Sequence, residues 1–317
     1  MSAADAKPEL DRAEVLGVLV PACITRVYAE APTFSSFANA FTIGKSPLRQ
    51  ACHDFQQLAE AGAEAGAMSA ELVEIATRAF RLACDNKTSK LCDPALEGLR
   101  LLFATGLVQG ATEGWAPKVS RSDASPEPSS PAPSPDPTPS SDDLERERAL
   151  SSLVGSVAKC AEVNVSSTHV ACVACVLAAH ASDSCIIRGD GLAQLARSTL
   201  HLAVAASTDR DRVAARKALV RVINETFARA GLMAEAHSGS VTSSVTTAID
   251  EDTAVDEDTA VVEPGSRESD ALLLTLTLCA IAAKPLDGSN DEYKSHARVL
   301  AMDLVRLFFI FVWANCN

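Results

Sequence analysis

Three apolar periods that follow one another between residues 169 and 230 constrain the fold more than any other feature of the chain. In each period, apolar side chains recur at intervals of three and four residues, which places them on one face of an α-helix. Short polar turns separate the periods, so each helix has one face to bury and one to expose to water. The predicted inward faces are Val170, Val173, Ala174, Leu177, Ala178 and Ala181; Leu192, Leu195, Ala196, Thr199, Leu202, Ala203 and Ala206; and Ala215, Leu219, Val222, Ile223, Thr226, Phe227 and Ala230.

Helices of this length do not fold alone, because an isolated helix under about 15 residues is marginal in water and is stabilised by the surface on which it packs. Hydrophobic residues make up 47% of the chain, mostly as Ala, Leu and Val, and aromatic residues only 4%. This balance favours helices over sheets. We therefore predict an all-α fold, an α-solenoid of the armadillo or HEAT type built from antiparallel helix pairs.

The sequence before residue 110 predicts two pairs of helices. Asp11 is placed to cap the first helix, and Pro21 inside it predicts a kink or a split, because proline cannot donate a backbone hydrogen bond. The second helix is expected over about residues 48–62. The predicted inward residues of the first helix are Val15, Leu19, Ala22 and Cys23.

Ser69 and Asp93 are the expected N-caps of the next two helices, because their side chains can accept hydrogen bonds from the first turn. Pro94 would then take the first position of the later helix, where a missing N–H costs nothing, and Gly106 marks its end. The predicted inward residues are Leu72, Ile75, Ala76, Ala79, Phe80 and Ala83, and then Leu96, Leu99 and Phe103.

Two tracts of biased composition interrupt the helical pattern. The first, SDASPEPSSPAPSPDPTPSS, holds a large share of the 15 prolines, and the second is acidic and contains EDTAV twice. Neither composition can bury a core, so both tracts are predicted to be disordered linkers. The predicted organisation is a first helical half at 1–116, a Pro/Ser-rich linker at 117–143, a second helical half at 144–231, an acidic linker at 232–268, and closing helices at 269–317.

Two helices are expected after the acidic linker. One runs from about Ser269 to Lys284 before Pro285, although its Thr–Leu alternation leaves a strand as an alternative. The other begins near Asp291. Its inward residues are predicted to include His296, Val299, Leu300, Leu304 and Leu307.

Three separated blocks of the sequence resemble parts of one known family and occur in the same order as in that family. They are SKLCDPALEGLRLLFATGLVQG at 89–110, SDSCIIRGDGLAQLARSTLHLAVAAS with ARKALVRVINETFARAG within 169–230, and SDALLLTLTLCAIAAKPLDG with KSHARVLAMDLVR within 269–306. Together they resemble the dimerisation and cyclophilin-binding (DCB) region of large Arf guanine-nucleotide exchange factors of the brefeldin-A-inhibited type. In that family the third block leads into the homology region upstream of the exchange domain.

The resemblance implies a regulatory module. In that family the region self-associates, joins the helical region that follows it, and helps recruit the enzyme to Golgi membranes through Arf or Arf-like GTPases; its name also implies a cyclophilin partner. The exchange reaction belongs to a downstream domain whose FRLPGE-type motif this sequence lacks. We therefore expect a cytoplasmic chain, peripheral at Golgi membranes, with no enzymatic activity or cofactor. The alternative is an armadillo-type scaffold unrelated to Arf.

The two ends of the sequence carry further expectations. The start, MSAADAKPELDRAE, lacks the apolar core of a signal peptide, and no stretch reaches the roughly 20 apolar residues that span a bilayer. The last residues, LFFIFVWANCN, depart from the family, which continues with an ordinary amphipathic helix. This departure predicts a truncated gene product or a mispredicted last exon.

Charge is distributed unevenly. The formal net charge of -13 argues against a general nucleic-acid binder, whose affinity comes from Lys and Arg on phosphates. One helix flank is nevertheless basic and is the candidate contact for anionic lipid head groups or an acidic partner; a solvated helix face is the alternative. This flank consists of Arg210, Arg212, Arg216, Lys217, Arg221 and Arg229.

The ten cysteines and the histidines are not predicted to form a catalytic or metal site. Cys172 and Cys175 form the sequence's C-x-x-C pair, but a structural zinc site needs four ligands, so buried thiols are expected and a zinc or thiol enzyme is the alternative. No nucleophile or acid stands at a recognisable catalytic spacing from the histidines, which are interpreted as packed or solvated. This interpretation covers five of the six histidines, namely His53, His180, His201, His237 and His296.

Overall fold

The computed structural model describes residues 11–32, 46–65, 70–114, 141–231, 266–283 and 292–316. These residues are mostly helical, as the all-α prediction requires, and they include a two-residue parallel pair of strands. The elements are α1 (Arg12–Glu14), the π-helical η1 (Val15–Leu19), α2 (Val20–Glu30), α3 (Pro47–Ala65), α4 (Ala70–Asp85), α5 (Ser89–Ala104), β1 (Gly110–Ala111), α6 (Ser141–Cys160), α7 (Ser166–His180), β2 (Cys185–Ile186), α8 (Gly189–Ala205), α9 (Asp209–Arg229), α10 (Arg267–Ala282) and α11 (Glu292–Cys316).

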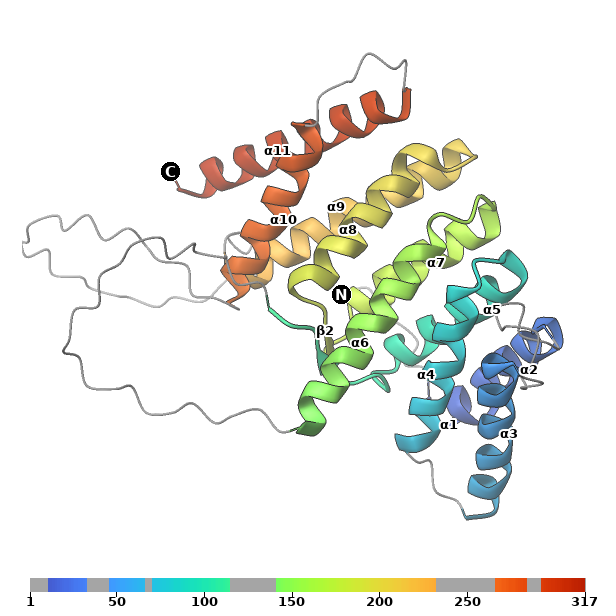
Figure 1. Cartoon of the computed structure of the whole chain (residues 1–317). Helices are drawn as coiled ribbons and strands as arrows, with labels where there is room; N and C mark the ends of the chain where they lie inside the picture. Colours follow the sequence, from blue (N-terminus) through green and yellow to red (C-terminus); the bar gives the residue numbers. More distant parts are fainter. Residues whose placement is uncertain are drawn as a thin grey trace, which may run out of the picture.

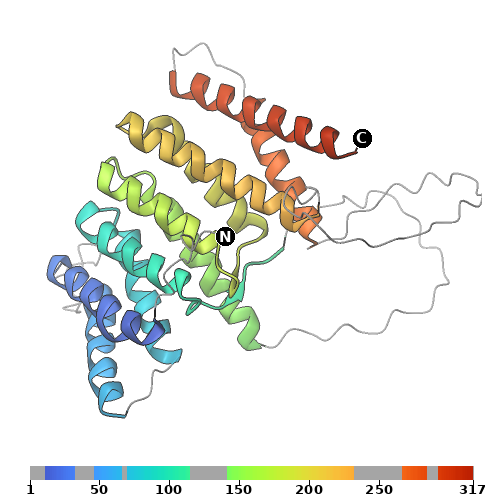
Figure 2. The ribbon, with the colours of Figure 1, turned by 180° about the vertical axis from the view of Figure 1, so that it is seen from behind.

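The helices form an array that follows the chain from α1–α3 at one end to α10 and α11 at the other (Figure 1). One row consists of α3, α4, α6, α8 and α10, in which each helix packs on the next. The other row, nearer the viewer in Figure 2, consists of α2, α5, α7 and α9. Contacts between α4 and α5, α6 and α7, and α8 and α9 connect the rows, and α11 packs on α10 and α8 at the end of the array.

The first helix begins and divides as predicted. The carboxylate of Asp11 accepts a hydrogen bond from the backbone N–H of Ala13 at 3.0 Å, which caps α1. Before Pro21, the chain widens into the π-helical segment η1 and then continues as α2. Proline has no N–H to donate, and a π-turn is a known way to accommodate such a defect within a helix. One inward residue was wrongly predicted, since Ala22 is exposed whereas Ile24 is buried.

Asp93 is not an N-cap. Helix α5 begins at Ser89 because Thr88 is extended, with φ −105° and ψ 131°, and its carbonyl accepts the N–H of Cys92 at 2.8 Å. Pro94 therefore lies inside the helix and removes one of its hydrogen bonds. The carboxylate of Asp93 instead accepts the hydroxyls of Ser167 and Thr168, and so connects α5 to the start of α7.

Gly106 ends the same helix as predicted, with a positive φ of 66° that favours glycine. The other expected N-cap, Ser69, lies outside the described residues. Helix α3 extends a few residues beyond the predicted span at its C-terminal end.

The inward face of α7 was predicted only in part. Val173 is buried as expected, but Val170 is exposed, and the helix also buries Cys172, Cys175, Val176 and Ala179. Apolar residues surround this helix on nearly all sides, so their spacing does not select one face. Which side of α7 is buried is therefore determined by the helices on which it packs, namely α5, α6 and α9.

The faces predicted for α8 and α9 are confirmed, since every inward residue named for them is buried. In α11 the prediction is partly wrong. Leu304 is buried, but Val299 is 54% exposed and His296 and Leu307 are exposed as well. The small residues Ala297 and Ala301 take the inward positions. The strand alternative for the helix before Pro285 is excluded by α10.

Both predicted linkers lie largely outside the described residues. Their described edges are helical, since α6 begins at Ser141 and α10 at Arg267. Within the part of the chain that the structure describes, no helix is both long enough and apolar enough to cross a membrane.

Candidate functional site

Two segments distant in sequence meet beside the start of α8. The chain that leaves α5 pairs with the loop after α7, with Gly110 donating to the carbonyl of Ser184 at 3.1 Å and Thr112 to that of Ile186 at 2.9 Å. The hydroxyl of Thr112 accepts the N–H of Arg188 at 2.6 Å and donates to its carbonyl at 2.8 Å. The loop that precedes α8 is thus held at three successive points.

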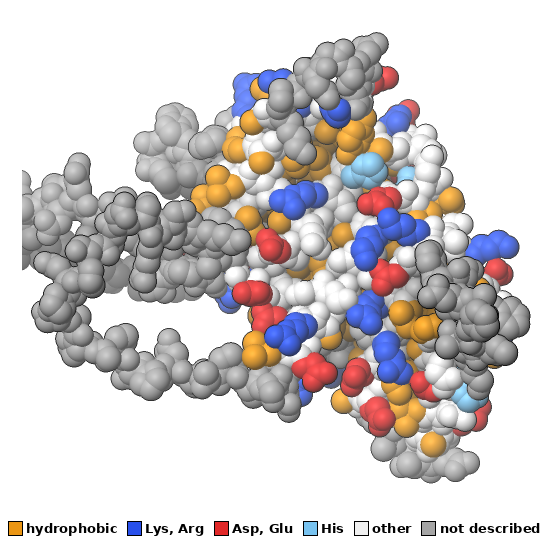
Figure 3. Space-filling view, in the orientation of Figure 1, with side chains coloured by type: hydrophobic (Ala, Val, Ile, Leu, Met, Phe, Trp, Pro, Cys, Tyr) orange, Lys and Arg blue, Asp and Glu red, His pale blue; other side chains and the backbone are white. Residues whose placement is uncertain are grey.

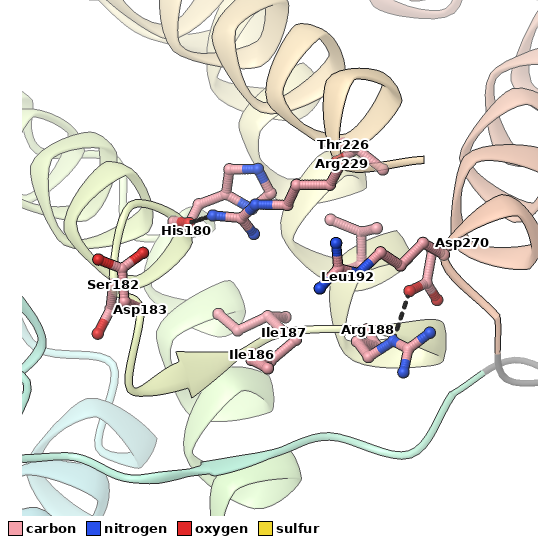
Figure 4. Close-up of a pocket in the computed structure, with 11 residues that line it drawn as sticks. His180, Ser182, Asp183, Ile186, Ile187, Arg188, Leu192, Thr226, Arg229 and Asp270 are labelled. Carbon is pink, nitrogen blue, oxygen red and sulfur yellow. Dashed lines mark hydrogen bonds and ion pairs between the residues drawn. The ribbon is translucent and has the colours of Figure 1, made fainter. Parts of the chain in front are cut away.

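A cavity of about 250 Å³ opens next to this loop (Figure 4). The end of α7, the loop itself, α8, the end of α9 and the start of α10 all contribute to its wall. Its lining residues are His180, Ser182, Asp183, Ile186, Ile187, Arg188, Leu192, Thr226, Arg229, Arg267 and Asp270.

Asp270 connects two elements on one side of this cavity. One carboxylate oxygen accepts the Nε–H of Arg188 at 2.7 Å, and the other accepts the backbone N–H of Gly189 at 2.9 Å (Figure 4). The Asp270 side chain is 7% exposed, so it needs these donors in place of water. A carboxylate at the first N–H of α8 is also stabilised by the helix dipole. The pair therefore holds α10 against the start of α8.

His180 lies at the opposite side, where its backbone carbonyl accepts a hydrogen bond from Arg229 at 2.6 Å (Figure 4). Its imidazole is 3% exposed and lies 3.6 Å from a carboxylate oxygen of Glu225. Burial, and then the positive charges of Arg229 and Arg221, lower the pKa of His180 to about 4, against the opposing charge of Glu225. The imidazole is therefore neutral at pH 7, and its approach to Glu225 is not an ion pair there.

The predicted basic flank lies on α9 and is mostly exposed, as expected. Two of its members are engaged by α8. Arg212 donates to the carbonyl of Ala206 at 3.1 Å, and Arg216 approaches that of Ala203 at 3.4 Å. Cations at the C-terminal end of a helix satisfy its last carbonyls and its dipole. These two arginines thus stabilise the turn between α8 and α9.

The remaining members of the flank separate into two groups. Arg210 and Lys217 are exposed, and Arg221 pairs with Glu225 at 2.6 Å along the same helix. Arg229 lines the cavity. Figure 3 shows the opposite side of the molecule, where basic and acidic side chains are interspersed.

Cys172 and Cys175 are fully buried in α7. Burial raises the pKa of Cys172 to about 12 and that of Cys175 well above its ordinary value, so neither thiol ionises near pH 7. Among the residues that the structure places, no group of three or more His, Cys, Asp or Glu side chains is arranged to hold a metal ion.

The histidines have different surroundings. His201 lies beside Tyr293 of α11, with 2.9 Å between its Nδ1 and the phenol oxygen. His53 and His296 are exposed, His180 is buried beside the cavity, and His237 lies outside the described residues.

The cavity itself was not predicted. Arg188, Arg267 and Asp270 are not among the residues singled out from the sequence. The sequence offers one signal, an acid in the first turn of α10, but the arginine that it pairs with lies 82 positions earlier.

A scan of the chain against known family models finds no match, and a search of curated proteins finds none either.

Proposed function

We propose that this chain is a non-catalytic regulatory module of the Arf exchange-factor type, built as an armadillo-like α-solenoid. It would self-associate or join a parent exchange factor, bind an Arf or Arf-like GTPase, and act in the cytoplasm at the periphery of Golgi membranes. Cyclophilin is a further partner implied by the resemblance, and nucleic acid is not expected.

The position of the three resembling blocks supports this proposal most directly. Residues 89–110, 169–230 and 269–306 are separated by long tracts, yet they correspond to α5, α7 to α9, and α10 with α11. These helices pack on one another in the same order, α5 on α7, α7 on α9, and α8 on α10. The blocks therefore form one continuous surface, as a shared domain would require.

The connections between helices support the solenoid form. Only short turns join α4 to α5, α6 to α7, and α8 to α9, and in each case the joined helices contact each other. A short connection between contacting helices favours an antiparallel pair. Stacked helix pairs of this kind present extended surfaces that suit partner binding.

The test is a pull-down with the purified chain against Arf and Arf-like GTPases loaded with GDP or a GTP analogue, with light scattering on the same sample. A dimer that selects the GTP form is expected. A monomer that ignores every GTPase would leave an armadillo-type scaffold unrelated to Arf.

The basic flank can be tested in the same assay. Charge reversal of Lys217, Arg221 and Arg210 leaves the arginines that cap α8 in place and should weaken binding to an acidic partner or to anionic vesicles. A matched reversal at three exposed basic residues elsewhere, Arg26, Lys90 and Arg197, is the control. Equal binding by both variants and the unmodified chain would identify the flank as a solvated helix face.

A further inference from the structure

Three arginines from three separate segments line the cavity beside α8. Arg188 precedes α8, Arg229 ends α9, and Arg267 begins α10. Two carboxylates, Asp183 and Asp270, also line it, so the charged side chains of the wall sum to one positive charge. Glu225 and Glu268 are close to this region but are not part of the wall.

Two of these arginines are fixed by the protein itself. Asp270 holds Arg188 through its Nε, and the carbonyl of His180 holds Arg229 through one terminal nitrogen. For the other nitrogens of Arg229, and for Arg267, the described residues provide no hydrogen-bond acceptor or ion-pair partner. A cation that is already oriented loses little conformational entropy when it binds a ligand.

The size and lining of the cavity limit what can occupy it. Pockets that enclose drug-sized ligands range from roughly 300 to 1,000 Å³, so a volume of about 250 Å³ suits a group of a few heavy atoms. The planar guanidinium of arginine matches a phosphate in a bidentate arrangement. Ile187 and Leu192 are buried and give part of the remaining wall an apolar character.

We propose that this cavity binds the phosphate group of a phosphomonoester, with Arg229 and Arg267 as the contacting residues and Arg188 as the third cation. The source of the phosphate is either a small soluble molecule or a lipid head group. Nothing in this proposal depends on the function proposed above, because it rests on the cavity and its arginines alone.

The binding test uses the full chain and three probes that share the same group: inorganic phosphate, glycerol 3-phosphate, and phosphatidic acid in phosphatidylcholine vesicles. Titration at constant ionic strength measures the first two, and vesicle co-sedimentation measures the third, with phosphatidylglycerol vesicles as a phosphodiester control. R229Q and R267Q should each weaken binding about tenfold, because each substitution removes one charged hydrogen-bond donor to the phosphate.

R197Q is the matched control, because it removes the same charge from an exposed position on α8 outside the cavity. Its affinity should remain within twofold of the unmodified chain, and circular dichroism should verify that all three variants fold. Binding of a soluble probe identifies a soluble ligand, and binding of phosphatidic acid vesicles alone identifies a head group. Failure of all three probes, or an equal loss in R197Q, would overturn the proposal.

Discussion

The middle of the helical array and its C-terminal end use similar apolar sequences in different ways. In α5, Leu96, Leu99 and Leu102 are fully buried between α2, α4 and α7. In α11, which packs mainly on α8 and α10, Val299, Met302 and Leu307 are about half exposed.

This difference shows that apolar spacing specifies a helix, whereas the number of neighbouring helices specifies how much of it is buried. A helix in the middle of an array has neighbours on both sides, and a helix at its end has them on one. Local stability should therefore fall from α5 towards α11.

The largest expected effect is a loss of core packing in the middle. Leu99→Ala in α5 removes a fully buried side chain and should lower the free energy of unfolding by about 3 to 5 kcal/mol. The same change at Leu304 in α11, which is 5% exposed, should cost about 1 to 2 kcal/mol, because the end helix can relax around the cavity. Urea unfolding followed by circular dichroism measures both, and equal losses would contradict the gradient.

A second test adds volume to the same region. A Cβ at Gly98 of α5 would lie 2.2 Å from Cζ of Phe80, whose ring is fully buried in α4. Gly98→Ala should therefore destabilise the fold by about 2 to 3 kcal/mol. Gly155→Ala in α6 is the control, since its Cβ would meet only an oxygen of Gln194 at 3.5 Å, and it should be neutral or stabilising.

A second substitution tests whether the clash with the Phe80 ring causes this loss of stability. Phe80→Leu in the Gly98→Ala background should recover part of the lost stability, because the smaller side chain vacates the overlapping volume. If the two substitutions are simply additive, the clash with the ring is not the cause.

The contrast between α7 and α9 explains how far the sequence could predict the fold. In α9 the charged residues occupy one side, so the apolar face from Ala215 to Phe227 was identified correctly. In α7 the residues around Cys172 are apolar on nearly every side, and only contacts with α5, α6 and α9 decide what is buried. The prediction that Asp93 caps a helix was wrong for a related reason. Its hydrogen-bond partners are hydroxyls that lie more than 70 positions later in the sequence.

The cavity could not be predicted at all. Its arginines stand at positions 188, 229 and 267, and no local spacing connects them. The local position of a single wall residue can be predicted, as for the cation in the last turn of α9. Which residues come together around the cavity depends on how α8, α9 and α10 pack. The basic flank, by contrast, could be predicted as a row of charges on one helix. The sequence did not show that two of its arginines, Arg212 and Arg216, would bind the last carbonyls of α8.

A third test concerns His180, at the junction between the two regions. Its pKa of about 4 in the folded chain lies below its ordinary value of 6.5, so the unfolded chain takes up the proton first as the pH falls. This contribution to stability is complete above pH 6.5 and is lost as the pH falls towards 4. Between pH 7.5 and 5.0 the loss should be about 2 kcal/mol.

His180→Gln isolates this effect, because other groups also titrate over the interval. The difference in unfolding free energy between the two pH values should be about 2 kcal/mol smaller in the variant. An unchanged difference would mean that His180 is accessible to protons in the folded chain.

The smallest effect tests the C-terminal end directly. Asp270→Asn keeps an oxygen for the N–H of Gly189 but removes the charge that holds Arg188, and the loss should be about 1 to 2 kcal/mol because Arg188 is 24% exposed to water. Hydrogen exchange should become faster in α10 and α11, while the amides of α4 to α7 keep their protection. Asp190→Asn, at an exposed acid in the first turn of α8, should leave both groups of amides unchanged. If α4 to α7 also exchange faster in Asp270→Asn, the array opens as one unit, and the gradient from a tightly packed middle to a weaker end does not exist.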